Sequence, residues 1–162
     1  HPVSEKVKTQ GIKVVTLNDT RWQRCDIKAI SLLPNSLLKQ EAKEAGADEA
    51  LLIRNGFMTE GSASNSYAVF DSVIYTAPKN NQILPGITRD VVLSLAEQAG
   101  IAVVEEAVAE ASLSVADELW VSSSTKEILP ITTLNGQAVG SGKPGPVWHQ
   151  IDALYQQVKA EA

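Results

Sequence analysis

The sequence predicts an α/β (α+β) domain with a mixed, largely antiparallel sheet and packed helices. Three observations lead to this fold class. Short segments rich in β-branched and other apolar residues recur along the chain, and turn residues separate them. Three longer segments carry apolar residues at helical spacing. Hairpin signals are frequent, which requires much antiparallel pairing and disfavours a doubly wound parallel sheet.

The strands are expected where β-branched and apolar residues are densest. Asn55-Gly56 and Asn135-Gly136 are strong hairpin signals, and Asp71-Ser72 separates another strand pair. The expected strands span residues 12–17, 48–54, 57–59, 67–70, 73–76, 101–105, 119–121, 128–134 and 137–139.

Helices are expected over residues 31–45, 87–99 and 147–159, with a short helical turn at 112–117. Pro34 is compatible with the first turn of its helix, and Gly46 and Gly100 stand where helices end. The polar stretch 1–10 is interpreted as the remnant of a linker, and residues 11–162 as one domain.

Composition excludes several classes of function. The chain has 162 residues, of which 44% are hydrophobic, and its 14 basic and 19 acidic residues give a net charge of -5 without a basic cluster. A nucleic-acid partner is therefore not expected. No apolar run approaches the roughly 20 residues of a membrane span, so we expect no membrane partner and a cytoplasmic location.

Few residues suit metal or thiol chemistry. Cys25 is the single cysteine, which excludes an internal disulfide, and His1 and His149 lie at opposite ends of the sequence. Neither a two-histidine metal motif nor a local His-Cys dyad is present. We expect no metal site.

The stretch from Glu60 to Arg89 contains the residues best suited to chemistry. It places a carboxylate in a small, hydroxyl-rich turn and, after a hairpin, a glycine that opens a helix. A buried carboxylate stabilises a nearby cation, and the free N–H groups of a helix start attract an anion. Pyridoxal phosphate offers both groups, as a protonated ring nitrogen and a phosphate.

Four motifs in order resemble those of the class IV pyridoxal-phosphate enzymes, and most closely the bacterial D-amino acid aminotransferases. The motifs are RWQRCDIK at 21–28, TEGSASN at 59–65, ILPGITRDVV at 83–92 and ELWVSSST at 118–125. One departure is Ser66, where the family usually has an apolar residue. The resemblance implies the larger, C-terminal domain of the class IV fold.

Lys28 is the first candidate for catalysis. A lysine that bonds a cofactor aldehyde must lose its proton near neutral pH, which burial or a nearby cation favours. Arg21, Arg24 and Asp26 make its surroundings charged, a pattern typical of a solvated surface lysine. The resemblance instead places Lys28 on the Schiff-base lysine of the family.

Glu60, Ile87 and Thr88 are the candidates for holding the two ends of the cofactor. From the residues alone, Glu60 is either a cap or a surface carboxylate, and Gly86 with Thr88 either caps a helix or admits a phosphate. The resemblance implies that Glu60 faces the ring nitrogen, and that Ile87 and Thr88 bind the phosphate.

Small hydroxyl residues supply the remaining candidates. Residues 122–125 are either an oxyanion site or an ordinary serine turn after a buried strand. The resemblance implies that Ser124 contacts the phosphate, that Thr125 helps to bind substrate, and that Ser62 and Ser64 lie near the ring.

The resemblance also implies what the whole protein does. It predicts amino transfer between an amino acid, in particular a D-amino acid, and a 2-oxo acid. It further predicts a homodimer and an N-terminal domain, absent from this chain, that supplies the rest of the pocket. We expect this chain alone to be inactive or nearly so.

Three alternatives remain open. Branched-chain aminotransferase and aminodeoxychorismate lyase share the motifs, although Leu33 stands where the branched-chain enzymes usually have a tyrosine. A non-catalytic fragment is the alternative of another class.

The glycine pattern at 140–145 is interpreted as a loop, because it follows a hairpin, contains Pro144 and leaves no room for a second strand.

Overall fold

A computed structural model describes residues 2–162, so His1 and any role for it lie outside the described part of the chain. The helices are α1 (Glu5–Gln10), α2 (Leu33–Glu44), α3 (Ile87–Gln98) and α4 (Pro146–Glu161), with a 3-10 helix η1 (Glu110–Val115). The strands are β1 (Ile12–Asn18), β2 (Glu49–Arg54), β3 (Phe57–Gly61), β4 (Asn65–Phe70), β5 (Val73–Thr76), β6 (Val103–Glu105), β7 (Val108–Ala109), β8 (Glu118–Ser123), β9 (Glu127–Leu134) and β10 (Gln137–Ala138).

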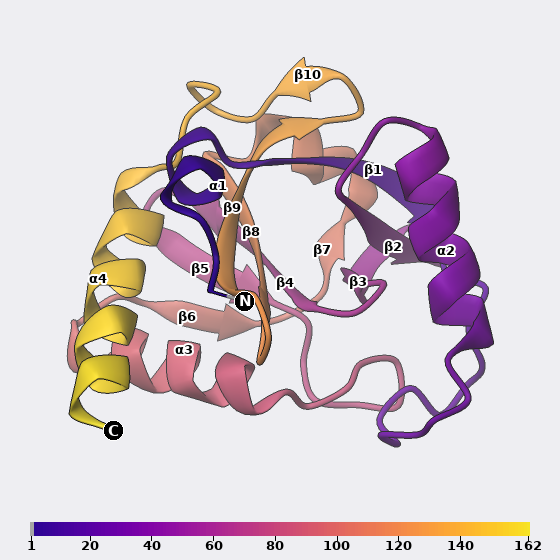
Figure 1. Cartoon of the computed structure of the whole chain (residues 1–162), viewed down its shortest axis with the longest axis horizontal. Helices are drawn as coiled ribbons and strands as arrows, with labels where there is room; N and C mark the ends of the chain where they lie inside the picture. Colours follow the sequence, from indigo (N-terminus) through magenta and orange to yellow (C-terminus); the bar gives the residue numbers. More distant parts are fainter. Residues whose placement is uncertain (1) are drawn as a thin grey trace.

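The strands form one mixed sheet in the order β6-β5-β4-β8-β9-β1-β2-β3-β7, with β10 paired to β9. Three of the pairings are parallel, namely β1–β2, β1–β9 and β5–β6, and the other six are antiparallel. The prediction of a mixed, largely antiparallel sheet is therefore confirmed. In Figure 1, α2 lies at one side of the sheet, while α3 and α4 lie together at the other end.

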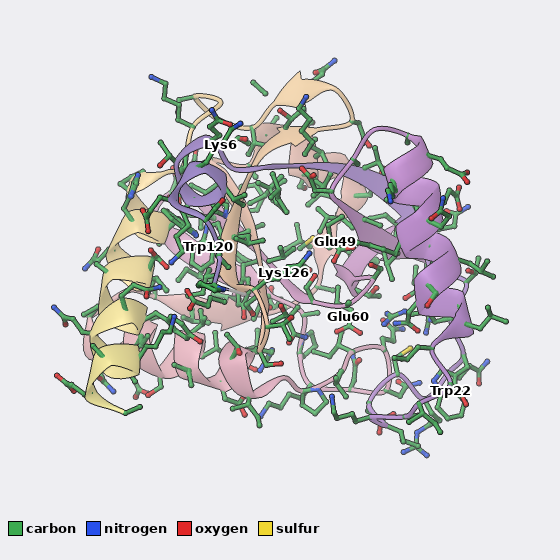
Figure 2. All side chains as sticks on the ribbon, viewed as in Figure 1. Lys6, Trp22, Glu49, Glu60, Trp120 and Lys126 are labelled. Carbon is green, nitrogen blue, oxygen red and sulfur yellow. The ribbon has the colours of Figure 1, made fainter. Side chains whose placement is uncertain are left out.

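The core consists of three apolar clusters that follow this arrangement. The largest joins the central strands to η1 and includes Leu51 and Met58. A second packs α3 and α4 on β4 and β8, where Tyr67 stacks on Trp120 with ring centroids 5.2 Å apart. The third joins α2 to β2. Figure 2 shows Trp120, Glu49 and Glu60 well inside the outline of the molecule and Trp22 at its edge.

Helix α1 was not expected from its polar sequence. The Ser4 hydroxyl accepts a hydrogen bond from the Val7 backbone N–H and so caps the helix. Lys8 then reaches both Glu127 and Asp152, at 3.1 and 3.3 Å. Ion pairs to β9 and α4 thus hold residues 5–10 against the domain, while their role as a linker remains a prediction.

Ser66 is a buried departure from an apolar pattern. Its side chain is 1% exposed on β4, and the hydroxyl has no hydrogen-bond partner among the described residues. A buried hydroxyl without a partner destabilises the folded state because it loses its hydrogen bonds to water.

We predict that Ser66→Ala raises the free energy of unfolding by about 1 kcal/mol, measured by urea denaturation. Thr76→Val is the matched control, because the buried Thr76 hydroxyl donates a 2.8 Å hydrogen bond to the Ser66 carbonyl. That variant is expected to lose about 1 kcal/mol. Equal destabilisation by both substitutions would contradict this account of Ser66.

Candidate functional site

Glu60 lies near the end of β3 and is 4% exposed. Its carboxylate accepts hydrogen bonds from three donors, which are Arg21 Nη1 at 2.5 Å, Asn65 Nδ2 at 3.0 Å and the Leu84 backbone N–H at 3.1 Å. The Leu84 N–H also lies 3.3 Å from the second carboxylate oxygen, so each oxygen already has two donor contacts. Glu60 can act on a ligand through its charge, because a buried carboxylate stabilises a nearby cation.

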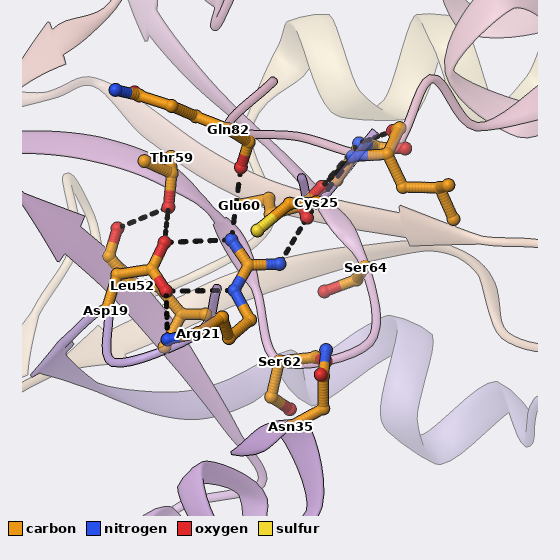
Figure 3. A network of polar contacts seen from close by, with 12 residues as sticks. Asp19, Arg21, Cys25, Asn35, Leu52, Thr59, Glu60, Ser62, Ser64 and Gln82 are labelled. Carbon is orange, nitrogen blue, oxygen red and sulfur yellow. Dashed lines mark hydrogen bonds and ion pairs between the residues drawn. The ribbon is translucent and has the colours of Figure 1, made fainter. Parts of the chain in front are cut away.

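Arg21 is itself held by a second carboxylate. Its Nε and Nη2 donate to Asp19 at 2.9 and 2.8 Å, and Nη2 also reaches the Gln82 carbonyl at 3.2 Å. Asp19 in turn accepts from the Thr59 hydroxyl at 3.0 Å and lies 3.2 Å from Arg54. Figure 3 shows Arg21 between Asp19 and Glu60, with Thr59 on the far side of Asp19.

The network sets the ionisation of Glu60. Burial raises the pKa of Glu60 to about 7, while the charge and hydrogen bond of Arg21 oppose that rise. Burial opposes the charge of Arg21 too, but Asp19 and Glu60 outweigh it and raise the pKa of Arg21. Glu60 thus changes charge near neutral pH beside a permanent cation.

The N-terminus of α3 is open to an anion. Gly86 is the N-cap and no side chain caps the helix, so the amides of Ile87 and Thr88 have no side-chain acceptor. Asn65 Nδ2 donates to the Leu84 carbonyl at 2.8 Å, and a Cβ on Gly86 would collide with Asn65 Oδ1. Asn65 therefore joins the Glu60 carboxylate to the start of α3.

The second helix start with a glycine pattern is closed. The loop at 140–145 leads into α4, where the Glu118 carboxylate accepts the backbone N–H groups of Val147 and Trp148 at 3.1 and 2.8 Å. A carboxylate already occupies the place that a phosphate would take. The loop interpretation of this glycine pattern agrees with the structure.

Ser62 and Ser64 lie in the turn between β3 and β4, and both contact a residue that was not predicted. The buried Glu49 carboxylate accepts both serine hydroxyls, with Ser64 Oγ at 3.2 Å. On the other side, Asn35 Nδ2 of α2 donates to the Ser62 carbonyl at 2.8 Å. The turn is therefore held by β2 and α2 together.

Ser124 and Thr125 lie in the exposed turn between β8 and β9. The antiparallel register pairs Ser122 of β8 with Asn65 of β4. Because Asn65 begins β4 directly after the Ser62–Ser64 turn, the two hydroxyl-bearing turns lie at the same end of this strand pair. Their contacts with a ligand remain predictions.

Lys28 lies on the exposed loop between β1 and α2, the loop that also supplies Arg21. Within the described residues its amine forms no hydrogen bond or ion pair. Asn81 holds this loop, because its carbonyl accepts the Cys25 N–H at 2.8 Å and its side chain donates to the Gln23 carbonyl at 2.7 Å. The Lys28 loop thus packs beside the segment that leads to α3, and the role of Lys28 stays a prediction.

The residues that sequence reasoning missed are those that hold the candidates in place. Asp19, Arg21 and Glu49 are all buried, although charged residues are usually exposed. Arg21 appeared only as the first residue of the motif at 21–28 and as part of the charged surroundings of Lys28. Its partner Glu60 is 39 positions away, so no local pattern reveals the pair.

The described residues contain no group of three or more His, Cys, Asp or Glu side chains able to hold a metal ion. Among the same residues, none of the helices has the length and apolar character needed to cross a membrane.

Comparison with known proteins identifies relatives of about twice the length. D-alanine aminotransferase of Bacillus licheniformis is 46% identical over 152 residues, which cover 94% of this chain and 54% of that protein. The enzyme of Staphylococcus aureus strain COL is 45% identical over 147 residues, or 91% and 52%. The chain spans about half the length of these relatives.

Solved structures share the fold. A branched-chain amino acid aminotransferase from T.th., solved with pyridoxamine 5'-phosphate, superposes with a TM-score of 0.90 at 30% identity, over 97% of this chain and 53% of that chain. The branched-chain enzyme of Escherichia coli gives 0.82 at 33% identity, over 92% and 52%. The sequence model described as amino-transferase class IV matches residues 1–134. The chain therefore belongs to the class IV aminotransferases, a family whose cofactor is pyridoxal phosphate.

Proposed function

We propose that this chain is the cofactor-bearing domain of an enzyme that transfers an amino group between a D-amino acid and a 2-oxo acid. The observation that supports it best is the coupling of the buried Glu60 carboxylate to the open N-terminus of α3 through Asn65 and Leu84. These two features match a cationic ring nitrogen and a phosphate at opposite ends of one cofactor.

The residues fit pyridoxal phosphate on structural grounds. The buried Glu60 carboxylate would stabilise a cationic ring nitrogen by its charge, and α3 has no side-chain cap that would compete with a phosphate. Glu60 would hold the ring nitrogen, Ile87 and Thr88 the phosphate, with Ser124 as a further phosphate contact. When bound, the cofactor supplies an electron sink for the charge left at the substrate α-carbon.

Lys28 would act as the base in this site. Its amine would hold the cofactor aldehyde between turnovers and take the proton from the substrate α-carbon during transfer. Thr125 would help to orient the substrate. Lys28 is exposed on the loop beside Arg21, and no partner among the described residues competes for its amine.

D-alanine is the proposed donor class because the relatives at 46% and 45% identity are named D-alanine aminotransferases. The second candidate is a branched-chain amino acid, since solved branched-chain enzymes at 30% and 33% identity share the fold. Leu33, at the position where those enzymes usually carry a tyrosine, favours the first candidate.

The other half of the protein belongs to the proposal. We infer that an N-terminal domain contributes the remaining substrate contacts, that residues 1–10 connect it to residues 11–162, and that the protein is a cytoplasmic homodimer. Because half of the pocket is then missing, residues 1–162 alone are expected to turn over little or no substrate.

A first prediction concerns the ionisation of Glu60. Its pKa rises from an ordinary 4.5 to about 7 on folding, so its contribution to stability falls as the pH rises through that range. Arg21→Met removes the opposing cation and raises the pKa further. We expect the variant to lose about 3–5 kcal/mol of unfolding free energy at about pH 8, and less at about pH 5, by urea denaturation.

The double variant Arg21→Met/Glu60→Gln is the control for that experiment, because it lacks the Glu60 carboxylate while Asp19 stays in both variants. Its loss of unfolding free energy, relative to the unmodified chain, is expected to depend less on pH than that of Arg21→Met. If Arg21→Met lost the same unfolding free energy at both pH values, the assigned ion pair of Arg21 and Glu60 would be contradicted.

A second prediction identifies the cofactor lysine. The full-length protein with added pyridoxal phosphate is expected to show a visible absorbance band, and borohydride reduction followed by peptide mapping should place the label on Lys28. Lys43, an exposed lysine of α2, is the matched control, so Lys43→Ala should keep the band and Lys28→Ala should lose it. A label spread over surface lysines would refute the assignment.

A third prediction concerns the substrate. With 2-oxoglutarate as acceptor, the full-length protein is expected to use D-alanine with kcat/KM at least roughly tenfold above that for L-leucine. A preference for L-leucine would favour the branched-chain candidate, and no turnover of either would favour a non-catalytic protein. Residues 1–162 alone should be roughly 100-fold slower or worse, and comparable turnover would refute the need for the other half.

A further inference from the structure

Glu49 is a buried carboxylate to which neither the fold nor the proposed reaction has assigned a purpose. It is the first residue of β2 and is 6% exposed. Its Oε1 accepts the backbone N–H groups of Ala50 and Ser62 at 2.8 and 3.2 Å and also the Ser62 hydroxyl, while Oε2 accepts the Ser64 hydroxyl at 3.2 Å. Three of these four donors belong to the turn between β3 and β4.

The turn is built closely around this carboxylate. A Cβ on Gly61 would lie 3.3 Å from the Glu49 carboxyl carbon and would collide with Ser64 Oγ. The Gly61 N–H donates to the Ser64 carbonyl at 2.8 Å and closes the turn. Asn35 holds the Ser62 carbonyl from α2. With these contacts in place, the Ser64 hydroxyl has one well-defined position.

The number of protons on each group determines which hydrogen bonds the two serine hydroxyls can still form. A serine hydroxyl has one proton to donate, and an ionised carboxylate can only accept. Ser62 and Ser64 therefore both donate their hydroxyl hydrogen bonds to Glu49. Ser62 is 1% exposed, whereas Ser64 is half-buried. Ser64 Oγ thus remains available to a ligand, but only as an acceptor.

We propose that Glu49 is a positioning residue of the cofactor site, which fixes Ser64 Oγ as an acceptor for the amine end of the bound cofactor. The inference rests on the proposed function and adds the class of group that this turn recognises. An acceptor backed by a carboxylate attracts a hydrogen-bond donor such as an ammonium group and repels phosphate oxygens. The phosphate is thereby left to the start of α3.

The test uses the full-length protein and two probes, pyridoxamine 5'-phosphate, which carries the amine, and inorganic phosphate as its competitor. By calorimetry, Glu49→Gln and Ser64→Ala are each expected to weaken pyridoxamine phosphate binding roughly 5- to 100-fold. The inhibition constant of inorganic phosphate, measured as a competitor, should stay within about twofold of its value for the unmodified protein. The turn donates no hydrogen bond to a phosphate, so its substitution should not affect that constant. The double variant should bind no more weakly than Glu49→Gln alone, since both changes remove one shared interaction.

Glu118→Gln is the matched control. Glu118 is also a buried carboxylate, 5% exposed, that accepts two backbone N–H groups, but it does so at the start of α4. Its substitution should lower the melting temperature and leave the affinity for pyridoxamine phosphate unchanged. Equal loss of affinity in Glu118→Gln and Glu49→Gln would reduce the role of Glu49 to general stability and overturn the proposal.

The outcomes separate this inference from the proposed function. If the unmodified protein binds no pyridoxamine phosphate, both are wrong. If it binds but Glu49→Gln and Ser64→Ala bind equally well, only the role of Glu49 is refuted. Should Glu49→Gln fail to fold, Ser64→Ala still decides, because undiminished affinity in that variant contradicts the acceptor role of Ser64.

Discussion

The buried ion pair of Arg21 and Glu60 constrains more of the structure than any other polar contact. Burying one charge without its partner costs roughly several kcal/mol, so the two side chains must stay in contact in the folded state. Arg21 comes from the loop after β1, Glu60 from β3, and the Leu84 N–H from the segment before α3. One carboxylate therefore fixes three separate parts of the chain, and the proposed cofactor site lies where they meet.

The same chemistry is used in two ways at the helix starts. At α4 the protein supplies its own anion, Glu118, and the helix amides are satisfied internally. At α3 no side chain caps the first turn, and Asn65 crowds Gly86 so that any side chain there would clash. The fold thus leaves one helix N-terminus open beside Glu60 and closes the other, which lies in a region with no predicted site residue.

Carboxylates also divide the site by the kind of group each end can bind. Glu60 is a buried carboxylate beside the start of α3, and Glu49 accepts the hydroxyl hydrogen bonds of Ser62 and Ser64. Both therefore favour donors and cations in the middle of the site. An anion is favoured at the start of α3, where uncapped amides and the helix dipole act together. This separation orients an elongated ligand that has a phosphate at one end.

Local patterns in the sequence predicted most of the elements but not what joins them. Strand and helix periodicity predicted β1, α2, α3 and α4 to within a few residues at each end, and Asn55-Gly56 and Asn135-Gly136 marked real hairpins. The short strand β7 and helix α1 were missed, because two residues carry no period and residues 5–10 are polar. Asp19 and Glu49 were missed for a different reason. Their partners lie far away in the sequence, and only the folded backbone brings these charges together.

The measurement that tests the central claim most directly is a crystal structure of the full-length protein with pyridoxamine 5'-phosphate. We expect a Glu60 carboxylate oxygen within hydrogen-bonding distance of the pyridine nitrogen while Arg21 still contacts the other side of the carboxylate. We also expect the phosphate on the amides of Ile87 and Thr88. A ring nitrogen that faces another group, or a phosphate bound away from the start of α3, would contradict the account.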